Sequence, residues 1–144
     1  MANACGIADV LGGEKVLGWK VRNTMDLVGL SKRGVPKSAL SRLAKALGFT
    51  TTRMAAFLPV TERTIQRYKA RQYFKTYVSE QILELAELAA YGLEVFDDRE
   101  QFLGWLKEPT KGLGGRAPVE LLDTRFGVEM VRNELIRIEY GVFS

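Results

Sequence analysis

The amino-acid sequence predicts an all-α fold, because apolar residues recur every three or four positions along most of the chain and no segment sustains the alternation of a strand. Residues that start helices (Ser, Thr, Asp) and glycines or prolines that end them punctuate this pattern. The chain has 144 residues, 47% of them hydrophobic and 26% charged, a composition typical of a folded protein. We expect a helical bundle in residues 1–78, with a helix-turn-helix at about 51–72, and a small helical domain in residues 79–144.

Two helices are expected before residue 50. Apolar spacing predicts a helix from Glu14 to Val28, followed by a break at Gly29–Gly34. Pro36 suits an early position in a second helix, which Gly48 ends. The stripe that this helix would bury consists of Leu40, Leu43, Ala44 and Leu47.

The next segment has the residue types of a helix-turn-helix. A short helix is expected over Thr52–Phe57, and Thr61 is a good N-cap for a second one that ends near Gln72. Three positions meet the spacing of the motif: small Ala55 where the helices cross, Pro59 at the turn, and apolar Ile65 on the second helix. The spacing predicts that the second helix enters the major groove of DNA.

The last 66 residues show further helix starts and stops. We expect a helix that Ser79 caps and that reaches about Val95, and a second helix that begins with a capping box at Asp98–Gln101 and ends at Pro109. A short helix is expected from Pro118 to Leu122. The last helix is expected between its cap Thr124 and its stop Gly141. In the last helix the expected buried residues are Val128, Val131, Leu135 and Ile138.

The net charge of +4 is strongly segregated. Residues 1–29 are neutral, residues 30–78 hold eleven bases and one acid, and residues 79–144 hold seven bases and thirteen acids. The basic block suits DNA and the acidic block suits protein contacts. Two solvated faces of one domain are the alternative interpretation.

The basic block supplies the candidate DNA-binding residues. Arg63 and Arg67 are expected to contact guanines or phosphates, and Gln66 to read adenine. Thr61 is expected to cap this helix, and Thr64 and Lys69 are further exposed positions on it that would enter the groove. The candidates for phosphate contacts are Arg53, Arg71 and Lys75. Because one helix-turn-helix covers only a half-site, we also expect a homodimer.

Catalysis is not expected. The chain has no histidine, the commonest general base and zinc ligand, and no acidic cluster replaces it. Cys5 is the only cysteine, so no internal disulfide is possible. We predict no metal, no cofactor and no membrane span, and the absence of a secretory signal pattern predicts a cytoplasmic protein.

The C-terminal third resembles the Xre/MbcA/ParS family of bacterial antitoxins. The shared elements are Trp105-Leu106, Pro109, Leu113-Gly-Gly-x-x-Pro118, Leu121-Leu-x-Thr124, Gly127 and Arg137-Ile-x-x-Gly141. Upstream, Thr61-x-x-Thr64-Ile-x-Arg67 is similar to the family's helix-turn-helix region. The resemblance covers about residues 35–144. Each motif residue also has a structural interpretation as core, turn or helix start.

The resemblance implies a type II toxin–antitoxin pair. Its members bind RES-domain toxins that degrade NAD⁺, block the toxin's active site, and repress their own operons by binding operator DNA within a larger hetero-oligomer. The apolar end of the chain suggests how the toxin would be contacted. The candidate residues are Tyr140, Val142, Phe143 and Ser144, and a frayed terminus is the alternative.

Three other functions compete with this one. A free-standing repressor without a toxin would have the same DNA-binding half, and the neighbouring gene would distinguish it. An enzyme is disfavoured by the missing histidine. A purely structural dimerisation module does not explain the basic block.

Overall fold

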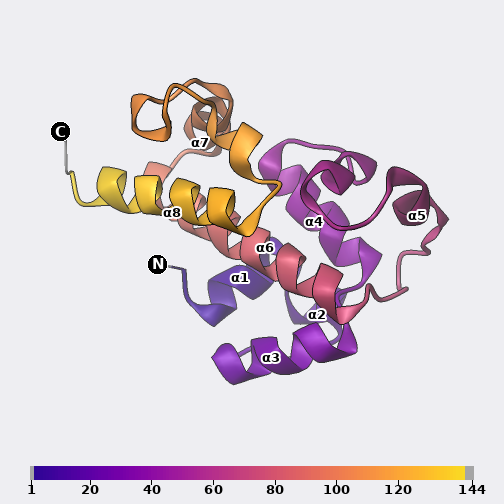
Figure 1. Cartoon of the computed structure of the whole chain (residues 1–144). Helices are drawn as coiled ribbons and strands as arrows, with labels where there is room; N and C mark the ends of the chain where they lie inside the picture. Colours follow the sequence, from indigo (N-terminus) through magenta and orange to yellow (C-terminus); the bar gives the residue numbers. More distant parts are fainter. Residues whose placement is uncertain (1, 142–144) are drawn as a thin grey trace.

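The computed structural model describes residues 2–141. In this part of the chain the regular structure is helical, with eight α-helices, three 3₁₀ helices and no strand. The predicted all-α class is therefore confirmed. Figure 1 shows one long helix, α6 (Thr76–Phe96), through the middle of the molecule, with shorter helices packed around it.

The N-terminal segment differs from the prediction. Instead of one helix over Glu14–Val28 it forms three: α1 (Ala4–Val10), α2 (Gly13–Leu17) and α3 (Thr24–Arg33). Helix α2 ends at Gly18, and a reciprocal capping box between Asn23 and Asp26 starts α3. The predicted break at Gly29–Gly34 is also wrong, because α3 continues through Gly29 and ends at Gly34.

The predicted elements of the basic block are present. Helix α4 (Lys37–Leu47) begins directly after Pro36 and ends at Gly48, and its whole predicted stripe is buried. A 3₁₀ helix, η1 (Thr52–Phe57), and α5 (Glu62–Arg67) follow. Helix α5 is shorter than predicted because the chain becomes extended at Tyr68.

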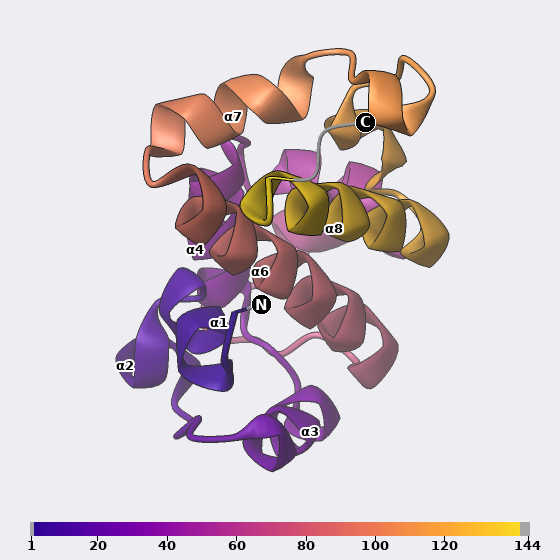
Figure 2. The same cartoon turned by 90° about the vertical axis from the view of Figure 1, so that its left-hand side faces the viewer.

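Helix α6 joins the two halves of the chain. It packs against α1, α3 and α4 on the N-terminal side and against α7 and α8 on the C-terminal side, as the second view also shows (Figure 2). Buried residues from Ile7 to Leu135 form one continuous core around it. The predicted division of the chain at residues 78 and 79 thus falls within this helix.

The start of α6 corrects the prediction for Ser79. The N-cap is Lys75, and Ser79 lies one turn inside the helix with no exposed surface. Its hydroxyl accepts a hydrogen bond from the Val35 N–H (2.9 Å) and donates one to the Phe74 carbonyl (3.2 Å). Ser79 therefore ties α6 to two backbone segments instead of capping the helix.

The C-terminal elements follow the predicted order. They are α7 (Arg99–Lys107), η3 (Pro118–Leu121) and α8 (Arg125–Glu139), and a 3₁₀ helix, η2 (Lys111–Leu113), lies in the predicted loop before η3. Thr124 caps α8 as expected, and the predicted stripe of this helix is buried except for Ile138, which is half-buried. Asp98 caps α7 by accepting from the Glu100 N–H in place of the predicted capping box with Gln101, and Gly114 and Gly115 adopt positive φ in the loop. Gly127 in α8 packs directly on the Leu121 carbonyl, which a Cβ at this position would overlap. The motif glycine thus allows α8 to approach η3 closely.

Candidate functional site

Helix α5 lies at the end of the molecule away from α7 and the C-terminal end of α8 (Figure 1). Thr61 caps it by accepting a hydrogen bond from the Thr64 N–H at 3.1 Å, and its hydroxyl also donates to the Thr64 hydroxyl at 3.0 Å. Ile65 is fully buried and holds α5 on η1, with Ala55 half-buried between them. The predicted geometry of a small crossing residue, a turn and an apolar anchor is therefore present.

The outer side of α5 carries the predicted base-contacting residues. Arg63, Gln66 and Arg67 are all exposed, whereas Thr64 is half-buried and engaged with Thr61. Within residues 2–141, no carboxylate forms a salt bridge with Arg63 or Arg67. Their guanidinium groups can therefore meet a phosphate or a guanine without first breaking an ion pair.

The segment 69–75 after α5 is held rigidly although it has no regular structure. Its backbone pairs with residues 35–38 through bonds from Lys37 N–H to the Gln72 carbonyl (3.1 Å), from Ser38 N–H to the Ala70 carbonyl (2.8 Å), and from Phe74 N–H to the Val35 carbonyl (2.9 Å). The rings of Tyr68 and Phe74 stack with centroids 4.7 Å apart. Fixed backbone lowers the entropy cost of binding a ligand with side chains from this segment.

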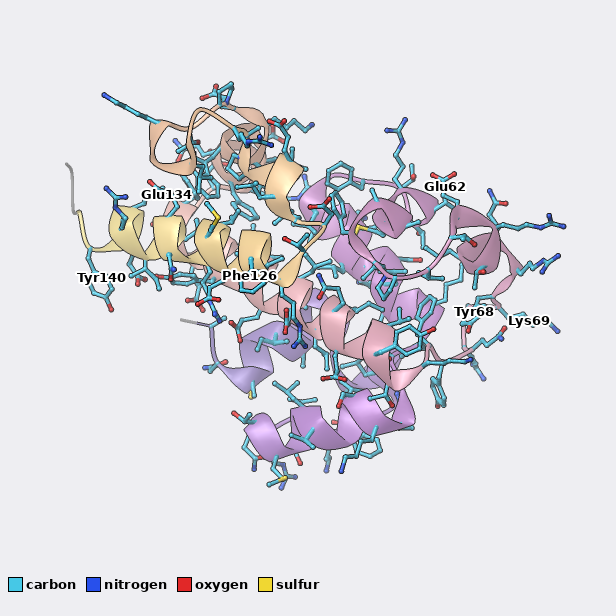
Figure 3. All side chains as sticks on the ribbon, in the orientation of Figure 1. Glu62, Tyr68, Lys69, Phe126, Glu134 and Tyr140 are labelled. Carbon is cyan, nitrogen blue, oxygen red and sulfur yellow. The ribbon has the colours of Figure 1, made fainter. Side chains whose placement is uncertain are left out.

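Four more of the predicted DNA-binding cations lie on η1 and on the segment after α5. They are all exposed: Arg53 on η1, and Lys69, Arg71 and Lys75 on the segment 69–75. Figure 3 shows Lys69 projecting from the tip of the molecule beside Tyr68. We call these four exposed cations, together with Arg63 and Arg67, the basic end.

The opposite half of the molecule is organised by ion pairs between α6 and α8. Arg125 contacts Glu84 at 3.0 Å and Glu80 at 3.8 Å, and Arg132 contacts Glu87 at 2.7 Å. A groove of about 350 Å³ lies along this seam and is lined mainly by charged side chains. The buried face of α8 sets its rotation, and therefore which residues it presents to solvent, while these partly exposed ion pairs add only a little to it.

Helix α8 carries exposed apolar residues that sequence reasoning missed. Phe126 is 82% exposed and Met130 is 46% exposed. Of the predicted toxin contacts, Tyr140 is 71% exposed, while Val142, Phe143 and Ser144 lie outside the described residues. A helical projection of α8 would have revealed the missed residues, because they lie opposite the predicted buried stripe.

Tyr91 in α6 is a buried polar group at this seam. Its hydroxyl donates a hydrogen bond to the Glu139 carboxylate at 2.6 Å. Burial, and then the bond to Glu139, raise the pKa of the phenol well above its ordinary value. Tyr91 therefore stays protonated and anchors the end of α8.

Neither a metal site nor a membrane-spanning helix is found among residues 2–141. No group of three or more His, Cys, Asp and Glu side chains is placed to hold a metal ion. None of the helices found there combines the length and apolar character needed to cross a bilayer.

The fold therefore defines a helical protein that has a helix-turn-helix with a basic end and a separate acidic helical part. Family comparison agrees with both parts: residues 26–87 match the antitoxin Xre-like helix-turn-helix domain, and residues 92–141 match the antitoxin Xre/MbcA/ParS C-terminal toxin-binding domain. The two matched regions meet within α6. The chain belongs to the Xre/MbcA/ParS antitoxin family and is the non-enzymatic antitoxin of a type II toxin–antitoxin system, which binds its toxin through the C-terminal domain.

Individual relatives support this assignment. The chain is 32% identical, over 83% of its length and 82% of the relative, to the Prs ADP-ribosylating antitoxin of Sphingobium sp. (strain YBL2). It is 30% identical, over 55% of its length and 54% of the relative, to the antitoxin Xre of Photorhabdus laumondii. Among solved structures, it is similar in fold to a chain of the M. tuberculosis MbcT–MbcA toxin–antitoxin complex, with a TM-score of 0.59, 24% identity, and coverage of 75% of this chain and 96% of that chain. The alternative of a free-standing repressor without a toxin is therefore wrong.

Proposed function

We propose that this antitoxin inhibits a RES-type toxin that degrades NAD⁺. The observation that carries the proposal is the similarity over most of the chain to a relative named as a Prs ADP-ribosylating antitoxin, a name that points to ADP-ribose chemistry. ADP-ribosylation takes its ADP-ribose from NAD⁺, so a toxin of that kind and an NAD⁺-degrading toxin share one substrate. The acidic C-terminal part suits a partner whose active site is basic enough to bind the two phosphates of NAD⁺.

The experiment is expression of the adjacent toxin gene with and without this chain. We expect the toxin alone to deplete cellular NAD⁺ and stop growth, and co-expression to restore both. An unchanged NAD⁺ level during toxin arrest would contradict the proposed substrate. The similarity to the ADP-ribosylating antitoxin favours a second candidate, transfer of ADP-ribose to a protein. An ADP-ribosylated protein in arrested cells would identify transfer, whereas free ADP-ribose would identify hydrolysis.

We further propose that the chain represses its own operon through the basic end. The support is the arrangement of unpaired Arg63 and Arg67 on α5 beside a rigid cationic segment. Arg63→Ala and Arg67→Ala should each weaken operator binding by about 1–3 kcal/mol if they contact bases. Arg116→Ala is the matched control, because Arg116 is equally exposed but belongs to the C-terminal part. Unchanged affinity in both α5 variants would contradict the assignment of α5 as the recognition helix.

Operator binding also leads us to propose a homodimer within the larger toxin–antitoxin assembly. One recognition helix of six residues contacts few base pairs, and two-fold repressors cover two half-sites. Light scattering on the purified chain should give at least twice the 16.1 kDa monomer mass. A monomer at concentrations that saturate the operator would contradict this proposal.

The end of the chain is a proposed contact with the toxin's active site. Tyr140 projects from the end of α8, and Val142, Phe143 and Ser144 follow it in sequence. Burial of Phe143 in a partner would contribute roughly 1.5–3 kcal/mol. Deletion of residues 142–144 should therefore impair neutralisation in co-expression. Normal growth and NAD⁺ in the deletion strain would assign neutralisation to the surface of the domain.

A further inference from the structure

The exposed apolar residues of the C-terminal half all lie on one face of α8. Among residues 79–141, the large apolar side chains classed as exposed are Phe126, Met130 and Tyr140. At 100° per residue these three positions fall within a stripe about 80° wide, on the side opposite the buried Val131 and Leu135. We call this stripe the α8 outer face. Figure 3 shows Phe126 near the start of α8 and Tyr140 near its end.

We propose that the α8 outer face is the surface on which the cognate toxin docks, with Phe126 as its main anchor. This inference rests on the proposed function, because it takes the partner to be an enzyme that binds NAD⁺. The whole of α8 lies within residues 92–141, which match the family's toxin-binding domain. The stripe extends over fifteen residues, a rise of about 21 Å from the first to the last, which is a length suited to a protein groove.

The composition of the α8 outer face fits a protein interface. Aromatic residues, Met and Arg are enriched in interface cores, and the stripe contains Phe126, Met130 and Tyr140 with Asn133 and Arg137 between them. Phe126 projects from a helix whose rotation is fixed by its buried face. An anchor on a rigid helix loses little conformational entropy when it is buried.

Charge favours the toxin over a second copy of this chain as the partner that covers the α8 outer face. Residues 79–144 hold thirteen acids and seven bases, so pairing two copies through α8 would bring two acidic domains together. A toxin that binds a dinucleotide needs positive charge around its pocket, and such a partner complements the acidic domain. Helix α5 lies at the other end of the molecule from the C-terminal end of α8 (Figure 1), whereas Arg125 at the start of α8 borders Phe57 and Pro59 of the helix-turn-helix.

The test measures binding of purified full-length variants to the toxin encoded by the adjacent gene. Phe126→Ala should weaken binding by about 30-fold or more, the size of an interface hot spot, and Met130→Ala by about 5-fold. Met25→Ala is the matched control, because Met25 is 73% exposed on α3, outside the toxin-binding domain, and its truncation should leave affinity unchanged. Both α8 side chains are exposed, so circular dichroism and melting temperature should match those of the wild-type chain.

Three results would overturn the proposal, and they are distinguishable. Wild-type affinity in Phe126→Ala and Met130→Ala would refute the docking surface and leave the proposed toxin intact. Loss of a wild-type dimer in Phe126→Ala, with toxin affinity retained, would assign the face to a second copy. No binding by the wild-type chain would contradict the proposed partner itself and, with it, this surface.

Discussion

The substitution Ser79→Ala tests whether a buried hydroxyl, and not a helix cap, organises the junction of the two halves. Ser79 has no exposed surface, and its Oγ is the acceptor for the Val35 N–H, a group that is itself fully buried. The same hydroxyl donates to the Phe74 carbonyl. Alanine would leave the Val35 donor and the Phe74 acceptor without this partner, in a space too tight for easy rearrangement.

The magnitude follows from these two lost bonds. An unsatisfied buried donor costs about 1–3 kcal/mol, and a lost bond to a carbonyl adds about 0.5–1.5 kcal/mol. We therefore expect Ser79→Ala to lower the free energy of unfolding by about 2–4 kcal/mol. Urea denaturation followed by circular dichroism should show a lower midpoint with an unchanged m-value.

The control is Ser31→Ala, because the Ser31 hydroxyl donates only to the Val28 carbonyl one turn back in α3. That change should cost less than about 0.5 kcal/mol, as is usual for half-exposed positions. A Ser79→Ala loss as small as that of Ser31→Ala would refute the reasoning, since it would mean that water or a backbone shift satisfies Val35 equally well.

Three further predictions address other parts of the molecule. Gly127→Ala should destabilise the protein by at least about 2 kcal/mol in urea because its Cβ would overlap the Leu121 carbonyl, whereas Gly104→Ala, with open space around it, should be neutral or stabilising. The raised pKa of Tyr91 means that its contribution to stability is complete below pH about 10 and is lost as the pH rises above that value, where the unfolded phenol ionises. Tyr91→Phe should therefore show a shallower fall in unfolding free energy between about pH 9 and 11, and equal slopes would contradict the burial of this phenol. Finally, operator affinity should fall on the order of 10³-fold between 50 and 200 mM salt if the six cations of the basic end contact phosphates, and a weak salt dependence would exclude that role.

The elements that could be predicted from sequence are those whose signals are local. The stripe of α4 and the caps Thr61, Asp98 and Thr124 depend on neighbours within four residues, and the structure has all of them. At these positions the hydrophobic pattern and the capping residue indicate the same helix, so the helix can be predicted without knowledge of tertiary contacts.

The sequence-based predictions are wrong where contacts between residues far apart in the sequence determine the local structure. In the N-terminal segment, the Trp19 indole N–H bonds to the Asp26 carbonyl across a turn, and Arg33 stacks over the Trp19 ring 5.2 Å from its centroid. These contacts favour two separated helices over the continuous one that apolar spacing suggested. Ser79 was misassigned for the same reason, since its partner Val35 lies 44 residues earlier in the sequence. Exposure of Phe126 is a different case, because a helical projection of α8 from its predicted buried stripe would have indicated it.

Helix α6 explains how one small chain can hold two surfaces of opposite charge in a fixed relation. Its first turn, through Ser79, fixes the backbone that carries the basic end, and its later turns pair with α8 through Glu84 and Glu87. The two surfaces meet near the start of this helix, where Lys75 precedes α6 and Glu80, which pairs with Arg125 of α8, lies five residues later. Because a continuous helix, and not a flexible linker, joins them, the basic end and the acidic part of the chain keep one fixed orientation relative to each other.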